Sequence, residues 1–189
     1  MRDGIERKNM SKQAVVVVDL QNDYLTSGSW PLVGVDAAVQ KAAKVLEDAR
    51  SKGIPIIHVR HESPEGAPFF VAGSQGAEII PAVAPVDGEE VVVKNFPNAF
   101  RDTDLKTRLD AKGIKDVIII GAMSHMCIDA TARAASDHGY NVTVVEDAAA
   151  TRDADFNGVI VPANYVHAAF MSALGFAYGK VVKTEEYLK

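Results

Sequence analysis

The chain has one cysteine, Cys127, and its surroundings in the sequence suit a nucleophile. It follows the apolar run 117–120 and a Gly-Ala turn, and it precedes a helical pattern that stops at Gly139. The free N–H groups and positive dipole end of a helix start favour a thiolate over a thiol. The alternative is that Cys127 is a small buried hydrophobe, a common role for a lone cysteine.

Two further reactive residues follow apolar runs in the same way. Asp19 ends the run 14–18, and Lys94 ends the run 91–93. Taken singly, Asp19 could cap a loop or a helix, and Lys94 could be a solvated charge at a strand end. With Cys127 they supply an acid, a base and a thiol, which is a combination suited to covalent catalysis.

These residues depend on an alternation of apolar runs and helical patterns along the chain. We expect strands at 14–18, 54–59, 91–93, 117–120, 142–145 and 180–182, and helices at 35–52, 102–112 and 162–174 as well as after Cys127. The alternation predicts an α/β fold, a Rossmann-like three-layer sandwich with a six-stranded, mostly parallel sheet and helices on both faces. Ligands bind such sheets at the C-terminal strand ends, where Asp19, Lys94 and Cys127 are expected.

One segment, 61–90, breaks the alternation. It is rich in Pro and Gly and carries the apolar pairs Phe69-Phe70 and Ile79-Ile80. Connections of this length usually serve function, so we expect a packed lid, the alternative being a disordered insertion. Exposed on a monomer, the four side chains would form an unusually apolar patch. We therefore expect a homodimer or larger homo-oligomer with this segment near an interface, reaching a neighbour's active site.

Composition narrows the class of protein further. The 189 residues predict a flexible tail at 1–12 and a single domain at 13–189, with 48% hydrophobic and 24% charged residues. A net charge of −5 without a basic block argues against nucleic acid. Apolar runs of strand length predict no membrane span. A single cysteine excludes an internal disulfide and fits the cytoplasm. No glycine-rich phosphate loop follows the first strand, so no nucleotide cofactor is expected.

Three segments of the chain resemble the signature segments of a known superfamily. VVVVDLQNDYL, VVVKNFPNAF and GAMSHMCIDATARAA are similar to those of the isochorismatase-like cysteine hydrolases, which include nicotinamidases, N-carbamoylsarcosine amidohydrolases and streptothricin hydrolases. The similarity covers about residues 13–183. It implies a catalytic triad of Asp19, Lys94 and Cys127 that cleaves a C–N bond of a small amide, lactam or carbamoyl compound without a cofactor. The resemblance also implies that the protein forms homo-oligomers, as members of this superfamily commonly do.

The resemblance further implies the geometry around the nucleophile. A cis peptide is expected between Ala122 and Met123, and an oxyanion hole from the backbone N–H groups of Met123 and Cys127. Isochorismatases proper cleave a vinyl ether and typically lack this cysteine, so Cys127 favours C–N hydrolysis. Two alternatives stay open: an isochorismatase-type vinyl-ether hydrolase, and a non-catalytic protein whose thiol senses redox state.

The chain departs from nicotinamidases where they bind a metal. They carry an Asp-x-His pair after the second strand, whereas this chain reads HVRHESPEG at 58–66. His58, His61 and Glu62 are candidate ligands there, but the pattern is missing, so no metal is predicted.

Residues of the substrate pocket are expected in loops near the predicted site. The aromatic candidates are Tyr24, Trp30, Phe69, Phe70, His125 and Phe156. The alternative for each is packing in the core or in an interface. Arg60, at the end of the second strand, is expected to receive a substrate carboxylate, the alternative being a surface ion pair.

Overall fold

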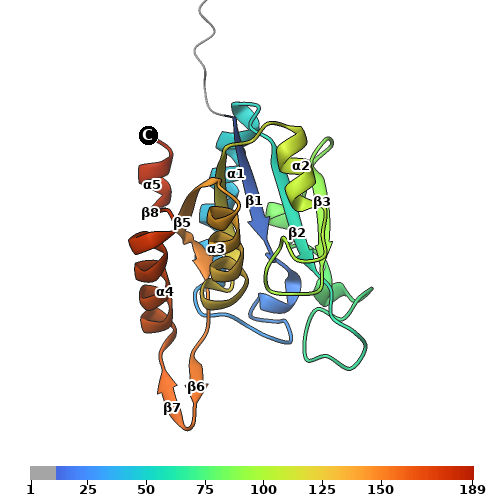
Figure 1. Ribbon diagram of the computed structural model, residues 1–189. Coiled ribbons are helices and arrows are strands. Elements are labelled where there is room, and N and C mark those ends of the chain that lie inside the picture. Colours follow the sequence, from blue (N-terminus) through green and yellow to red (C-terminus); the bar gives the residue numbers. More distant parts are fainter. Residues whose placement is uncertain (1–11) are drawn as a thin grey trace, which may run out of the picture.

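The computed structural model describes residues 12–189, which build a parallel sheet in the order β3-β2-β1-β4-β5-β8 (Figure 1). The strands are β1 (Gln13–Val18), β2 (Ile56–His61), β3 (Glu90–Lys94), β4 (Asp116–Ala122), β5 (Asn141–Ala150) and β8 (Lys180–Val182). Every neighbouring pair is parallel. The expected α/β fold with a six-stranded sheet is confirmed. The expected tail lies outside the described residues except for Lys12, whose carbonyl accepts from Lys115 and Asp116.

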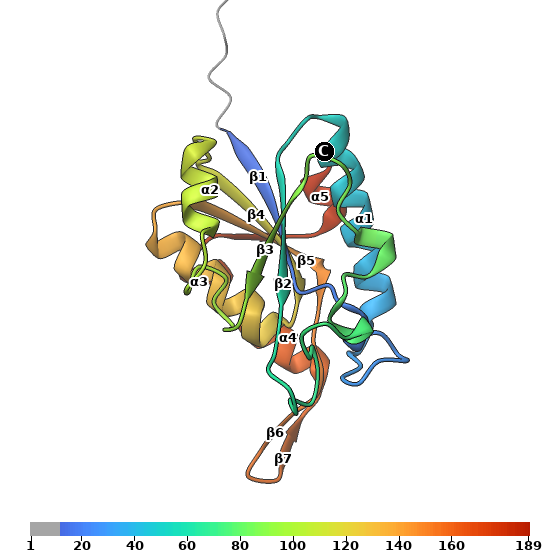
Figure 2. The ribbon, with the colours of Figure 1, turned by 90° about the vertical axis from the view of Figure 1, so that its right-hand side faces the viewer.

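Helices cover both faces of the sheet, as a three-layer sandwich requires (Figure 2). On one face lie α1 (Val35–Ser51) and α5 (Thr184–Tyr187), and on the other α2 (Leu105–Ala111), α3 (Asp129–Asp137) and α4 (Ala163–Ala177). A hydrophobic core lies on each face of the sheet. Within β1, Val15 and Val17 belong to the core on the α1 face, and Val16 and Val18 belong to the core on the opposite face. A strand buried on both faces explains the unbroken apolar run in the sequence. No helix of residues 12–189 is long and apolar enough to cross a bilayer.

The segment 61–90 is packed, as a lid would be, but it does not form an exposed apolar patch. Phe70 and Ile80 are buried in the core beneath α1, and Phe69 and Ile79 are partly buried against the same core. The physical reason for expecting an interface at this segment is therefore wrong. Asp23 explains the difference, because its buried carboxylate accepts from the backbone N–H of Phe70 at 2.7 Å and draws the segment inward.

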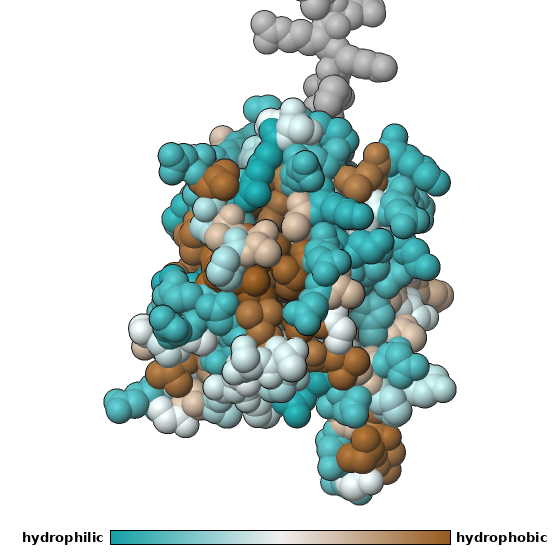
Figure 3. All heavy atoms as spheres, turned by 180° about the vertical axis from the view of Figure 1, so that it is seen from behind, coloured by the Kyte–Doolittle hydropathy of each residue, from teal (hydrophilic) through white to brown (hydrophobic). Residues whose placement is uncertain are grey.

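An antiparallel hairpin that the sequence analysis did not predict projects from the body. Its strands are β6 (Ala154–Phe156) and β7 (Val159–Val161) (Figures 1 and 2). Phe156, Val159 and Ile160 are exposed on this hairpin. Figure 3 shows hydrophobic residues, in brown, on the projection at the bottom of the molecule. Strands of three residues are too short for an alternating pattern to predict.

The two central strands approach each other closely at their C-terminal ends because position 121 is glycine. Gly121 has a φ of 131°, and a Cβ placed on it would lie 1.9 Å from the carbonyl oxygen of Val18. This contact fixes the distance between the end of β1 and the end of β4, from which Asp19 and the Cys127 segment emerge.

We predict that Gly121→Ala lowers the free energy of unfolding by about 3 kcal/mol or more, because β1 and β4 must separate to admit the methyl group. Gly53→Ala is the matched control, since Gly53 also has a positive φ, of 64°, but faces open space. Its cost should be only about 1–2 kcal/mol from the left-handed backbone. Urea unfolding measures both, and equal losses would contradict the close approach.

Candidate active site

The C-terminal strand ends bring the three predicted residues together. Asp19 directly follows β1, Lys94 is the last residue of β3, and Cys127 lies in a π-helical turn, Ser124–Ile128, that joins β4 to α3. The Nζ of Lys94 is 2.7 Å from Oδ2 of Asp19 and 3.3 Å from Sγ of Cys127. One ammonium therefore bridges the carboxylate and the thiol.

Burial makes the electrostatics of this group strong. The side chains of Asp19 and Lys94 are both 0% exposed. Burial alone would lower the pKa of Lys94, but the neighbouring Asp19 carboxylate, and after it Cys127, outweigh burial and raise that pKa above its usual value. Lys94 thus remains a cation. Apart from Lys94, neither oxygen of Asp19 has a partner among residues 12–189, so the carboxylate can accept a proton.

The structure changes the expectation that Cys127 rests as a thiolate. Burial raises the pKa of the Cys127 thiol well above its usual value, and the charge of Asp19 raises it further. Lys94 opposes both effects only in part. In addition, Cys127 precedes α3 in a π-helical turn instead of occupying the first turn of an α-helix. The resting group is a thiol beside a carboxylate.

His61 completes the surroundings of Lys94. Its Nδ1 lies 2.8 Å from Nζ of Lys94. Burial lowers the pKa of His61 and the Lys94 charge lowers it further, so the ring is neutral and accepts from the ammonium. The side chain of Gln21 fixes His61, because it accepts from the backbone N–H of His61 and donates to its carbonyl, both at 2.8 Å.

The same residues include a group of possible metal ligands. Donor atoms of Asp19, His61 and Cys127 lie within 4.8 Å of one another, but the ammonium of Lys94 contacts all three and occupies the position a divalent ion would need. The other candidate ligands have partners of their own: His58 pairs with Glu89 at 2.8 Å and Glu62 with Arg60 at 2.6 Å. These residues do not fit a metal site.

The turn that carries the nucleophile candidate is anchored to α4. Ser124 Oγ lies 2.7 Å from Nδ1 of His167, and Nε2 of His167 lies 3.0 Å from Glu146. The peptide bond between Ala122 and Met123 is cis. Within residues 12–189, the backbone N–H of Met123 has no hydrogen-bond acceptor. Sequence reasoning missed the contacts of Ser124 and His167, which are 43 residues apart.

Most of the expected pocket aromatics form one cluster. Tyr24 and Phe70 are buried, with ring centroids 4.6 Å apart, and Trp30 stacks on Phe69 at 4.9 Å. Tyr24 lies close enough to the candidate residues for them to affect its ionisation. Burial raises the pKa of Tyr24, and Asp19 and Cys127 raise it further.

The remaining pocket candidates lie outside that cluster. His125 is held by Thr151, with Nδ1 and Oγ1 2.7 Å apart. Phe156 is exposed on the projecting hairpin. Arg60 forms ion pairs with Glu62 and Glu78, which is the alternative to the expected carboxylate site.

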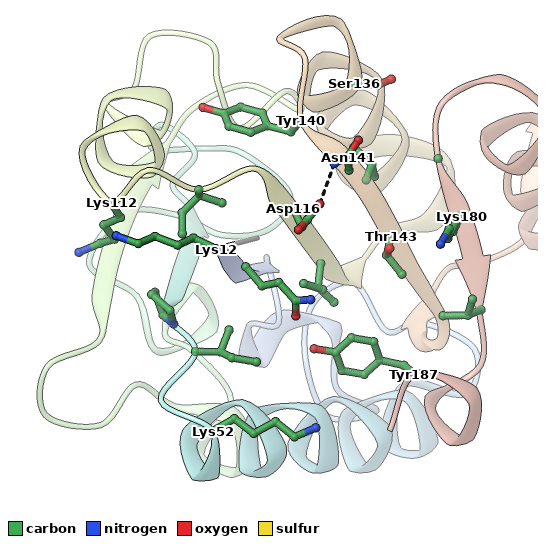
Figure 4. Close-up of a pocket in the computed structure, with 18 of the residues that line it drawn as sticks. Lys12, Lys52, Lys112, Asp116, Ser136, Tyr140, Asn141, Thr143, Lys180 and Tyr187 are labelled. Atoms are coloured by element: carbon green, nitrogen blue, oxygen red, sulfur yellow. Dashed lines mark hydrogen bonds between the residues drawn. The ribbon is translucent and has the colours of Figure 1, made fainter. Parts of the chain in front are cut away.

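A large cavity lies at the other end of the sheet. It measures about 1570 Å³ and is lined at the N-terminal strand ends by residues that include Gln13, Asp116, Asn141 and Lys180 (Figure 4). None of the three candidate residues lines it.

Comparison with known proteins identifies the family. The model of the isochorismatase domain matches residues 13–169. The chain belongs to the isochorismatase family. An uncharacterized isochorismatase family protein of Bacillus subtilis, YddQ, is 47% identical over 93% of this chain and 98% of its own length. The crystal structure of an isochorismatase from Pseudomonas putida superposes with a TM-score of 0.88, at 39% identity, covering 93% of this chain and 89% of that one.

The relatives of this isochorismatase-family hydrolase include amidohydrolases. Maleamate amidohydrolase of Pseudomonas putida is 31% identical over 94% of this chain and 86% of its own length. The resemblance seen in the three sequence segments is therefore confirmed at the level of the family.

We predict that Asp19→Asn speeds alkylation of Cys127 by iodoacetamide at neutral pH by about tenfold or more while it lowers turnover. Removing the Asp19 charge lowers the pKa of the thiol, and each pKa unit changes the thiolate fraction about tenfold. Mass spectrometry measures the rate at this sole cysteine. Asp87→Asn, which neutralises an exposed carboxylate, serves as the control and should change nothing. Slower alkylation in Asp19→Asn would contradict the assigned cause.

Proposed function

We propose that the protein is a cysteine hydrolase that cleaves the C–N bond of a small amide, lactam or carbamoyl compound through a thioester on Cys127. The observation that carries the proposal is the buried ammonium of Lys94, which bridges Asp19 and Cys127. A carboxylate and a thiol held beside one cation are the parts that nucleophilic acyl transfer needs. The amidohydrolase among the relatives supports the same bond type.

Asp19 starts the reaction by accepting the proton of Cys127. The thiolate that forms is stabilised by Lys94 and attacks the substrate carbonyl, making a C–S bond. The oxyanion receives hydrogen bonds from the backbone N–H groups of Met123 and Cys127. Asp19 then returns the proton to the leaving nitrogen, the C–N bond breaks, and ammonia or an amine departs.

Water completes the cycle without a cofactor. Asp19, ionised again, accepts a proton from a water molecule that attacks the thioester. The C–S bond breaks, the carboxylic acid product leaves, and the proton on Asp19 passes back to the thiolate of Cys127. Lys94 keeps its proton throughout, consistent with its raised pKa.

The two alternatives have less support. A vinyl-ether hydrolase needs no thiol, so it leaves the contact between Lys94 and Cys127 unexplained. A redox-sensing cysteine is normally exposed and has a lowered pKa. Cys127 is 6% exposed, and burial raises its pKa.

We also propose that the protein is a homodimer and that α4 forms the interface. This helix contains no Lys, Arg, Asp or Glu, yet Tyr165 and Phe176 on it are 64% and 92% exposed. A helix that is apolar on all sides is normally covered. Together with Phe156 of the adjoining hairpin, these rings expose on the order of 400 Å², about half of what one partner contributes to a stable interface.

The spacing along α4 favours a second copy as the partner. Tyr165 and Phe176 are equally far from the middle of the exposed face, where Ala168, Ala169 and Ser172 are small. In an antiparallel pair related by a two-fold axis, each Tyr165 would meet the partner's Phe176 while the small residues let the helices approach. Self-complementarity of this kind is what a two-fold interface requires.

We predict that Cys127→Ala lowers amide turnover by several powers of ten while leaving the thermal unfolding midpoint close to that of the wild type, because covalent catalysis needs the nucleophile. A screen of small amides, lactams, carbamoyl compounds and isochorismate, read by released ammonia, amine or product, provides the substrate. EDTA should leave the wild type active. Turnover within about tenfold of wild type in the variant would refute the thioester mechanism, and loss on EDTA reversed by a divalent ion would refute the metal-free site.

We predict that light scattering gives twice the chain mass of 20.2 kDa and that Phe176→Glu halves it, because a charge would be buried in the aromatic contact. Val86→Glu changes another exposed apolar residue, outside α4, and should remain dimeric. A wild-type mass near 20.2 kDa across a wide concentration range would exclude the assembly.

A further inference from the structure

His167 joins three elements of the fold through two hydrogen bonds. Its Nδ1 lies 2.7 Å from Oγ of Ser124, and its Nε2 lies 3.0 Å from Oε2 of Glu146. Ser124 begins the π-helical turn that carries Cys127, whereas His167 lies on α4 and Glu146 on β5. A carboxylate can only accept, so in a neutral ring Nε2 carries the hydrogen and Nδ1 accepts from the Ser124 hydroxyl.

Burial makes the side chain of Ser124 depend on this contact. Ser124 is 0% exposed, and within residues 12–189 its hydroxyl has no other hydrogen-bond partner than His167. A buried hydroxyl that loses its partner is costly, so the hydroxyl stays on Nδ1. Glu146 holds the other edge of the ring and thereby fixes the direction in which Nδ1 points.

Ser124 lies between the two backbone donors of the proposed oxyanion hole. Met123 directly precedes it, and Cys127 follows three residues later on the same turn. The carbonyl of Met123 accepts from the N–H groups of Met126 at 3.0 Å and of Ile128 at 3.2 Å, so the turn is closed within itself. The hydroxyl of Ser124 ties this closed turn to the rest of the fold, and both donors move with it.

His167 acts on this turn without acting on the thiol. Burial, Asp19 and Lys94 shift the pKa of the Cys127 thiol, and His167 is not among the causes. A change at His167 therefore alters the direction of the N–H donors while the proton transfer from Cys127 to Asp19 keeps its geometry. The two effects can be measured separately.

We propose that His167 is a positioning residue of the enzyme. Held by Glu146, it fixes Ser124 and so keeps the N–H groups of Met123 and Cys127 directed at the substrate oxygen. Donors of this kind stabilise the transition state only when they are aligned in advance. The proposal rests on the proposed amide hydrolysis and deepens it, because it assigns what holds the oxyanion hole in place.

Two reagents that attack the same thiol test the proposal. With p-nitrophenyl acetate, Asp19 takes the proton of Cys127, the thiolate adds to the ester carbonyl, and the C–O bond breaks to release nitrophenolate. This acylation passes through an oxyanion. Iodoacetamide alkylates the thiolate by displacing iodide, and no oxyanion forms. The ratio of the two rates therefore reports the oxyanion hole, after the nitrophenolate released by Cys127→Ala is subtracted.

The variants at position 167 separate positioning from packing. His167→Gln keeps a donor for Glu146 but offers Ser124 no acceptor, so acylation should fall about tenfold or more while alkylation is unchanged. His167→Asn places its side-chain oxygen where Nδ1 lies, so acylation should stay within about threefold of the wild type. Ser124→Ala should match His167→Gln, and the double variant should lose no more than either, because both remove one hydrogen bond.

Thr184→Ala is the matched control. Thr184 is 1% exposed, and its hydroxyl donates to Asp147 at 2.7 Å, so its removal costs a buried hydrogen bond of the same length on β5. Both rates should be unchanged in this variant. An acylation rate unaffected by His167→Gln, or a ratio that falls equally in Thr184→Ala, would overturn the role of His167.

The same measurements distinguish this proposal from the function on which it rests. Wild-type protein that is acylated at Cys127 but turns over no amide in the screen would overturn the amide hydrolase, and the acylation ratio would still decide the role of His167. Amide turnover that survives in His167→Gln with unchanged kcat would overturn the positioning role and leave the hydrolase intact. The supporting result is a lower kcat at unchanged KM, parallel to the loss in acylation.

Discussion

The buried ion pair between Asp19 and Lys94 is the interaction on which the site depends. Both side chains are fully buried, and taking two charges out of water costs several kcal/mol per ion. Lys94 offsets this cost by contacting His61 and Cys127 as well. Removing either charge would leave the other buried and uncompensated, at a cost of about 3–5 kcal/mol. The geometry of the thiol is therefore tied to the stability of the fold.

Sequence reasoning found the fold and the three candidate residues because both follow from local patterns. Asp19, Lys94 and Cys127 each come after an apolar run, and parallel strands bring such ends to one edge. The protonation state of Cys127 could not be predicted from the sequence, because it depends on how burial and the opposing charges of Asp19 and Lys94 balance in three dimensions.

Electrostatic partners explain the remaining differences. Arg60 stands two residues from Glu62 and pairs with it, whereas Arg152 forms no ion pair within residues 12–189, and its neighbour Asp153 accepts from the backbone N–H of Ala163 instead. Adjacent charges in the sequence therefore do not reveal which cation keeps its charge unpaired. The apolar residues of 61–90 were expected at the surface, but the carboxylate of Asp23 fixes that segment from within. The charge-free run of α4 was visible in the sequence, although its exposure was not.

The strand order places the cation of the site on an edge strand. Within residues 12–189, β3 pairs only with β2, so a ladder holds its backbone on one side, and Lys94 is its last residue. The amides of such an edge strand exchange with solvent through local opening, which costs less free energy than unfolding of the whole protein. Detachment of β3 and withdrawal of the ammonium from the thiol are then a single event. Amide protection along β3 thus reports the integrity of the site itself.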